Sequence, residues 1–132
     1  MHSAVNMGAD QLWKMIGQFN ALPDWHPAVT SSKLEDGGKL RRRSLTGGAE
    51  IVERLEKTDD GDRLYRYSIV SGPSPVANCT AALRVKDDGK GKATIEWSSE
   101  FDPAGASAID ATAAVQDVFK MGLENLRKMF GG

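Results

Sequence analysis

The stretch from Ser107 to Met129 constrains the fold of this chain most, because its apolar residues recur with the period of an α-helix. Placed at about 100° per residue, one side carries Ala108, Val115, Phe119, Leu126 and Phe130, flanked by Ala111, Val118, Gly122, Leu123 and Met129. The opposite side carries Asp110, Asp117, Lys120, Glu124, Arg127 and Lys128. So wide an apolar stripe is typical of a helix that lies on a large hydrophobic surface. We therefore predict a long C-terminal helix packed on a structure built by the preceding residues.

Short segments of alternating polarity precede this helix, and turn-forming residues separate them. The segments span residues 2–7, 28–34, 39–45, 49–57, 63–70, 76–86 and 93–101. Glycine, proline and aspartate at the breaks are typical of tight connections between antiparallel strands. Residues 9–17 and 20–24 instead show helical spacing and predict two short helices after the first strand. The expected fold class is α+β: a seven-stranded curved antiparallel sheet around a long C-terminal helix.

Length and charge limit the classes of function. A chain of 132 residues is near the commonest domain size, so we expect one domain over residues 1–132. Its 17 lysines and arginines against 18 aspartates and glutamates leave a net charge near zero. The only basic cluster, the three arginines at 41–43, has no aromatic residues interleaved with it. We therefore expect no nucleic-acid partner.

The sequence also lacks the features expected of a membrane-spanning helix or a metal site. No apolar run approaches the ~18 residues of a membrane-spanning helix, so we expect no membrane span. The single cysteine, Cys79, forms no internal disulfide and suits a reducing compartment, which predicts a cytoplasmic location. His2, His26 and Cys79 are not spaced as metal ligands, so we predict neither a metal site nor a cofactor.

Alternation within the strands indicates which side chains face the helix, because residues two apart share one face of a sheet. The inward set includes small residues and rings with polar tips: Tyr65, Tyr67, Cys79, Ala81 and Trp97. On the helix, the facing residues are Val115, Phe119 and Gly122. This mixture favours a ligand cavity with a few orienting hydrogen bonds, since a closed core usually contains aliphatic side chains. The alternative is a closed core in which Phe119 and Trp97 fill the gap.

A carboxylate is expected inside this wall, because Glu53 lies on the apolar face of its strand. A two-residue turn at 47–48 places Arg42 across from Glu53, and one bulge shifts the partner to Arg41 or Arg43. An inward carboxylate without a cation is costly, so an ion pair is expected. Two roles remain open: a polar anchor or acid–base group inside a pocket, or a partly solvated structural pair at the rim.

His26 is the second candidate for proton transfer, because an imidazole titrates near neutral pH. Its neighbours Trp25 and Pro27 restrict the backbone, and Trp25 is expected to contact a ligand. The alternative is a loop histidine that only bonds to the main chain. Cys79 is interpreted as an inert buried thiol.

Six motifs occur in an order that resembles a known family. They are residues 9–14 (ADQLWK), 19–27 (FNALPDWHP), 53–55 (ERL), 65–69 (YRYSI), 75–78 (PVAN) and 96–98 (EWS). Together they span nearly the whole chain and resemble the START/Bet v 1-like superfamily, also called SRPBCC, and within it the bacterial polyketide cyclase/dehydrase-type branch. The resemblance implies a helix-grip fold, in which a seven-stranded antiparallel sheet grips a C-terminal helix over a cavity.

Two functions agree with this resemblance. The first is binding of a small hydrophobic or aromatic metabolite, lipid- or polyketide-like, contacted by Trp25, Glu53, Tyr65, Tyr67, Cys79, Ala81, Trp97, Val115, Phe119 and Gly122. The second is a cyclase/dehydratase-type enzyme for an aromatic polyketide-like substrate. Its catalytic candidates are Glu53 and His26 for proton transfer and Arg42 and Arg43 for an oxyanion. We favour binding, because an ion-paired Glu53 is a weak base. The sequence leaves the oligomeric state open between monomer and homodimer.

Overall fold

The computed structural model describes residues 1–131. In chain order the elements are β1 (His2–Val5), α1 (Ala9–Ile16), α2 (Leu22–Trp25), β2 (Val29–Glu35), η1 (Asp36–Gly38), β3 (Leu40–Leu45), β4 (Glu50–Asp59), β5 (Leu64–Ser71), β6 (Val76–Asp87), β7 (Ala93–Pro103) and α3 (Ala108–Phe130). The short element η1 is a 3₁₀ turn that joins β2 to β3. The other elements begin and end within two residues of their predicted positions.

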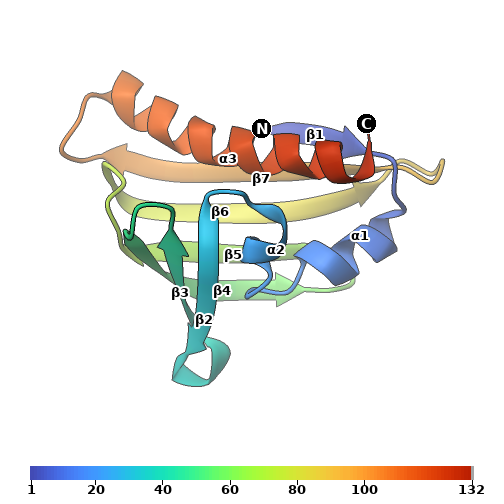
Figure 1. Cartoon of the computed structure of the whole chain (residues 1–132), viewed down its shortest axis with the longest axis horizontal. Coiled ribbons are helices and arrows are strands. Elements are labelled where there is room, and N and C mark those ends of the chain that lie inside the picture. Colours follow the sequence, from blue (N-terminus) through green and yellow to red (C-terminus); the bar gives the residue numbers. More distant parts are fainter. Residues whose placement is uncertain (132) are drawn as a thin grey trace.

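All seven strands form one antiparallel sheet in the order β1-β7-β6-β5-β4-β3-β2. From β2 to β7 each strand pairs with the next in sequence, and β1 completes the sheet beside β7. The sheet is curved, and α3 runs along its concave face (Figure 1). Residues of α1, α2, α3 and the inner sheet face share one hydrophobic core. The predicted α+β helix-grip fold is confirmed.

The helix α3 begins where Ser107 accepts a hydrogen bond from the Asp110 amide at 3.1 Å, which caps the first turn. Its buried residues are Ala111, Phe119, Gly122, Leu123 and Leu126. Ala108 and Met129 were expected in the buried stripe, but both are exposed. Ala108 is the first residue of α3, at the end where the helix diverges from the sheet (Figure 1), and Met129 lies in the last turn. No described helix has the length and apolarity needed to cross a membrane.

The connection between β3 and β4 has three loop residues instead of the expected two. The Leu45 amide donates to the Ala49 carbonyl at 2.8 Å, and this bond closes the loop at residues 46–48. Gly47 and Gly48 both have positive φ, at 98° and 92°, a region that favours glycine. The additional residue shifts the pairing of the two strands by one position.

This shift decides which arginine meets Glu53. Arg41 lies across the ladder from Glu53, and Arg42 lies across from Val52. Because a shift of one residue turns a side chain to the other face of the sheet, Arg42 points outward. Of the three arginines left open as partners of Glu53, Arg42 is therefore excluded, and the alternatives Arg41 and Arg43 are the ones that meet it.

Candidate functional site

Three buried charged side chains lie together on the concave face of the sheet: Arg41 and Arg43 from β3 and Glu53 from β4, here named the Arg–Glu–Arg cluster. The two arginines point the same way because they are two residues apart on one strand. Arg41 Nη2 and Arg43 Nε lie 2.8 Å and 2.9 Å from Glu53 Oε1. The side chains of Arg41 and Glu53 are fully buried and that of Arg43 is 4% exposed, so this is not a solvated rim pair.

Arg41 is held by several groups besides Glu53. Its Nη1 donates to the Phe19 carbonyl at 2.7 Å. The rings of Phe19 and Tyr67 lie 4.1 Å and 5.0 Å from the guanidinium carbon, within cation–π range. Burial opposes the charge, but Glu53 and the tyrosines Tyr65 and Tyr67 more than offset this effect and raise the pKa of Arg41 above its ordinary value. Arg41 therefore keeps its positive charge, and its contacts hold the guanidinium in place.

Arg42 does not belong to the site. Its guanidinium pairs in solvent with Glu35 at 2.9 Å and with Glu50 at 3.3 Å. Because Arg42 lies on the convex face, it reaches neither Glu53 nor the interior. Arg42 was expected as a candidate to stabilise a substrate oxyanion, but from the convex face it cannot reach a substrate in the interior.

A pocket opens beside the Arg–Glu–Arg cluster, between the sheet and the N-terminal half of α3. This sheet–helix pocket is lined by Arg43, Ile51, Glu53, Tyr67, Ile69, Ser74, Val76, Cys79, Ala81, Ser99, Val115, Val118 and Phe119. The cavity volume is about 30 Å³, and the hollow with its open mouth occupies about 410 Å³. The cavity itself therefore holds about two water molecules. Ligand pockets usually have volumes of roughly 300–1,000 Å³, so the cavity in this pocket is small.

Six of the ten residues expected to contact a ligand line this pocket: Glu53, Tyr67, Cys79, Ala81, Val115 and Phe119. Their contact with a ligand stays a prediction. The other four, Trp25, Tyr65, Trp97 and Gly122, lie in the packed interior instead.

Aromatic side chains fill the space where a larger cavity was expected. The Phe119 ring stacks on Trp97 with ring centroids 4.4 Å apart and ring planes inclined by 19°. Trp97 Nε1 donates to the Tyr67 hydroxyl at 2.9 Å, which fixes the orientation of the indole. The closed-core alternative is thus correct under the middle of α3, and the sheet–helix pocket lies towards the first half of the helix.

Gly122 faces these rings and not a cavity. A Cβ atom at this position would lie 2.7 Å from His26 Cδ2, 2.9 Å from Trp25 Cζ3 and 3.0 Å from Trp97 Cζ3. Gly122 was expected to contact a ligand, but three aromatic side chains occupy the space beside it. Gly122 instead allows them to approach the helix closely.

Both ring nitrogens of His26 are used in hydrogen bonds to the main chain. The Ala28 amide donates to Nδ1 at 3.2 Å, so Nε2 carries the proton and donates to the Val118 carbonyl at 2.7 Å. Burial is the largest influence on the imidazole and lowers the pKa of His26, as does the nearby charge of Arg43, against the opposite effect of the Val118 bond. His26 is therefore a neutral group that joins two segments, with no nitrogen left for a substrate.

The other polar groups of the pocket are neutral. Cys79 Sγ lies 3.3 Å from Ser99 Oγ, and burial raises the pKa of the Cys79 thiol, which disfavours the nucleophilic thiolate. Burial, together with the charge of Glu53, raises the pKa of the Tyr67 hydroxyl. Within residues 1–131, no three His, Cys, Asp or Glu side chains are grouped so as to hold a metal ion. The pocket thus offers one cationic group, neutral donors and apolar surface.

Several residues of the pocket were not among the predicted contacts. Ile69 and Ser99 share strand faces with Tyr67 and Trp97, so alternation places them in the same wall, although they were not among the expected ligand contacts. Val118 lies at the edge of the apolar stripe of α3. Ser74 comes from the β5–β6 connection and Val76 from the first position of β6, where no periodic pattern marks the inner side.

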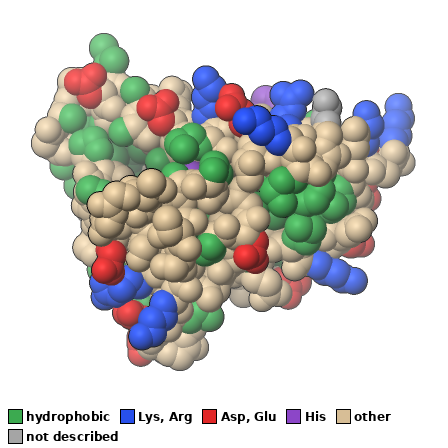
Figure 2. Space-filling view, in the orientation of Figure 1, with side chains coloured by type: hydrophobic (Ala, Val, Ile, Leu, Met, Phe, Trp, Pro, Cys, Tyr) green, Lys and Arg blue, Asp and Glu red, His purple; other side chains and the backbone are tan. Residues whose placement is uncertain are grey.

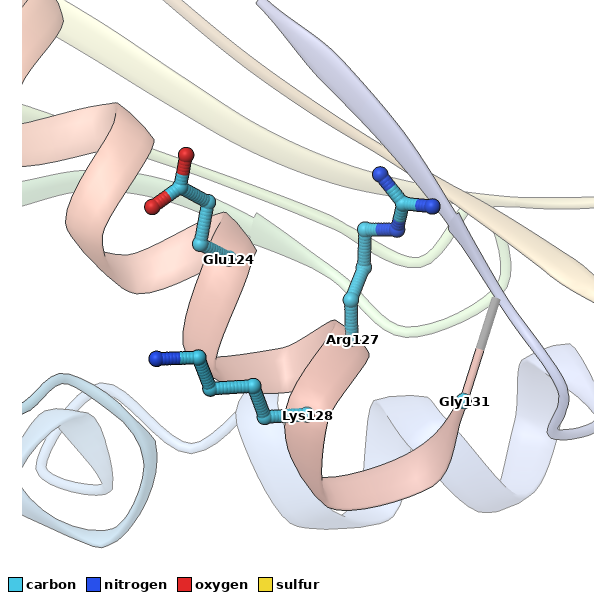
Figure 3. A pocket seen from close by; sticks show the side chains of 4 residues that line it. All are labelled: Glu124, Arg127, Lys128 and Gly131. Carbon is cyan, nitrogen blue, oxygen red and sulfur yellow. The ribbon is translucent and has the colours of Figure 1, made fainter.

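A second hollow lies at the C-terminal end of α3 (Figure 3). It is lined by Glu124, Arg127, Lys128 and Gly131. The three charged side chains are exposed, and Arg127 extends away from Glu124 and Lys128. Because these groups do not converge on one point, we assign no ligand to this hollow.

The sequence matches, over residues 2–131, the profile of the family described as "Polyketide cyclase / dehydrase and lipid transport". This chain belongs to that family. The match spans the same motifs on which the resemblance was based and agrees with the observed helix-grip fold. The comparison with curated proteins found no match.

Solved structures of similar proteins support the family assignment. XoxI from Bacillus cereus is 36% identical, with a TM-score of 0.96 over 98% of this chain and 92% of that chain. An uncharacterised protein from Bacillus thuringiensis is 37% identical, with a TM-score of 0.96 over 98% of this chain and 96% of that chain. The Zhui aromatase/cyclase from Streptomyces sp. R1128 is 15% identical, with a TM-score of 0.75 over 96% and 88% of the two chains. At that identity the likeness to the aromatase/cyclase shows the fold alone.

Proposed function

We propose that this chain binds a small apolar or aromatic molecule in the sheet–helix pocket. The observation that carries the proposal is the ion pair of Arg43 and Glu53, buried in the wall of a pocket whose other sides are mainly apolar. A buried ion pair contributes little to stability compared with apolar packing. Ligand sites, in contrast, commonly combine apolar walls with a few polar groups that fix orientation. The family description, which names lipid transport and polyketide chemistry, supports the same function.

The first half of α3 must move for such a molecule to enter, since the cavity volume is only about 30 Å³. Two hydrogen bonds join α3 to the α2–β2 segment. The Val118 carbonyl accepts one from His26, and Asn125 donates the other to the Trp25 carbonyl. In the first half, Ile109 is 82% exposed. Figure 2 shows hydrophobic side chains at the surface on this end of the molecule. Binding therefore requires a shift of residues 108–117 that widens the pocket, and such a shift can leave those two bonds intact.

Binding is favoured over catalysis because neither expected proton carrier is free. Both oxygens of Glu53 are engaged by arginines, Oε1 by Arg41 and Arg43 and Oε2 by Arg43. Both nitrogens of His26 bond to the main chain. General acid–base catalysis requires a group within hydrogen-bond reach of the substrate proton. A cyclase or dehydratase reaction in this pocket would first have to break one of these contacts.

The experiment is a titration of the purified protein with naphthoate and naphthamide, followed by amide-resolved NMR. We expect shifts at residues of the pocket wall, such as Ser99 and Val115, with either probe. Ala81→Leu fills the pocket and should abolish these shifts, although overpacking costs about 1–3 kcal/mol of stability. Ala82→Leu is the matched control, because Ala82 lies on the other face of the same strand. Absence of shifts with both probes in the wild-type protein would overturn the proposal.

A further inference from the structure

The Arg–Glu–Arg cluster carries an excess of positive charge. Two guanidinium groups share one carboxylate, and in the described chain no other carboxylate forms an ion pair with Arg41 or Arg43. One unit of positive charge is therefore uncompensated in a site that is almost fully buried. Burial of an unpaired charge is unfavourable, so a bound anion would be stabilised beside the cluster.

Arg43 is the member of the cluster that can meet such an anion. Arg41 already donates through Nη1 to the Phe19 carbonyl, whereas Arg43 lines the sheet–helix pocket. Glu53 contacts Nε and Nη2 of Arg43, which leaves Nη1 on the edge of the guanidinium away from Glu53. The Nε atom is buried without a well-directed hydrogen bond, although it lies 2.9 Å from Glu53 Oε1. Arg43 thus has donor capacity that the protein does not use.

The remainder of the pocket suits the other parts of an amphiphilic anion. The Tyr67 hydroxyl accepts a hydrogen bond from Trp97, so its own proton stays available as a second donor. The side chains of Ile69, Val76 and Val115 provide apolar surface along the same pocket. The only acid in the lining is Glu53, whose charge is already matched by Arg41.

We infer that the molecule bound in the sheet–helix pocket is an apolar monocarboxylate whose carboxylate pairs with Arg43. This inference rests on the proposed binding function and specifies its ligand class. A planar carboxylate matches the flat edge of a guanidinium and accepts two charge-assisted hydrogen bonds there. A single negative charge balances the cluster, whereas a neutral ligand of the same shape leaves the buried charge unpaired.

The first test compares naphthoate with naphthamide on the wild-type protein by isothermal titration calorimetry. The two probes have nearly the same shape and differ in charge, so naphthoate should bind about tenfold or more tightly. Equal affinity for the two probes would overturn the anion assignment while the proposed function stands. Binding of neither probe would overturn both.

The second test removes the charge of Arg43. Arg43→Gln leaves the balanced pair of Arg41 and Glu53, so the variant should fold, and its affinity for naphthoate should fall to that for naphthamide. Arg42→Gln is the matched control, because Arg42 is the next residue of β3 but pairs with Glu35 on the outer face. Arg42→Gln should keep the wild-type preference for naphthoate. An Arg43→Gln protein with undiminished preference would contradict the inference, and if this variant does not fold, the wild-type comparison decides alone.

Discussion

The Nε2 atom of His26 lies 2.7 Å from the carbonyl oxygen of Val118, in the middle of α3. This approach requires glycine at position 122, since a Cβ there would lie 2.7 Å from His26 Cδ2. Further along the same helix, Asn125 Nδ2 donates to the Trp25 carbonyl at 2.8 Å. The two bonds fasten the α2–β2 segment to the later part of α3.

Gly122→Ala should destabilise the protein. In most helices this change is favourable by about 1 kcal/mol, but here the new methyl group meets the rings of His26, Trp25 and Trp97. Overpacking outweighs helix propensity, so the free energy of unfolding in urea should fall by about 1–2 kcal/mol. Gly8→Ala is the control, because a Cβ at position 8 meets no atom within 4 Å. A more stable Gly122→Ala protein would show that the rings leave more space than the contacts indicate.

The stability of the protein should depend on the titration of His26. Its pKa is below the ordinary value of 6.5, mainly because of burial, so the unfolded chain binds the proton more readily than the folded one. The stability that neutral His26 contributes is fully present above the ordinary pKa of 6.5, and it is lost as the pH falls below that value. Urea unfolding between about pH 8 and about pH 5 should therefore show falling stability, and His26→Gln should flatten this slope. His2→Gln, at an exposed position, should keep the slope; an unchanged slope in His26→Gln would contradict the prediction.

Glu53→Gln should be strongly destabilising. The change leaves Arg41 and Arg43 buried together without a carboxylate, and loss of one partner from a buried pair costs roughly 3–5 kcal/mol. Glu50→Gln, on the same strand, removes an exposed partner of Arg42 and should cost about 0–1 kcal/mol. Guanidinium chloride titration of both variants measures the difference. Similar small losses in the two would mean that the interior of the sheet is more hydrated than the geometry indicates.

Most elements of the fold could be predicted because their apolar residues recur with the period of a strand or a helix. In β6, the alternating residues Cys79, Ala81, Leu83 and Val85 are all buried, as the sequence pattern indicates. Turn residues mark the strand ends, and the long apolar stripe identifies α3 without any knowledge of the sheet. Exposure of Ala108 could not be predicted in this way, because the angle between α3 and the sheet is set by tertiary packing.

The site was predicted only in part, for two physical reasons. One extra loop residue after Leu45 changes which arginine faces Glu53, and hairpin register depends on details of turn geometry that composition does not reveal. The size of the pocket depends on how Phe119 stacks on Trp97. Alternation places both rings inside but cannot tell whether they fill the interior or leave a cavity.

The stack of Phe119 on Trp97 should control the size of the pocket. Phe119→Ala removes a buried ring that also lines the pocket, and such changes cost about 3–5 kcal/mol of stability. The vacated space is continuous with the pocket, so fluorescence of the neutral apolar dye Nile red should rise in the variant. Met121→Ala is the control, since Met121 is exposed on the same helix and its loss should change stability by less than about 0.5 kcal/mol. If Phe119→Ala does not fold, Phe119→Leu gives a smaller effect in the same direction. A folded variant with no gain in dye binding would show that the helix closes over the space, and that the first half of α3 moves inward as readily as outward.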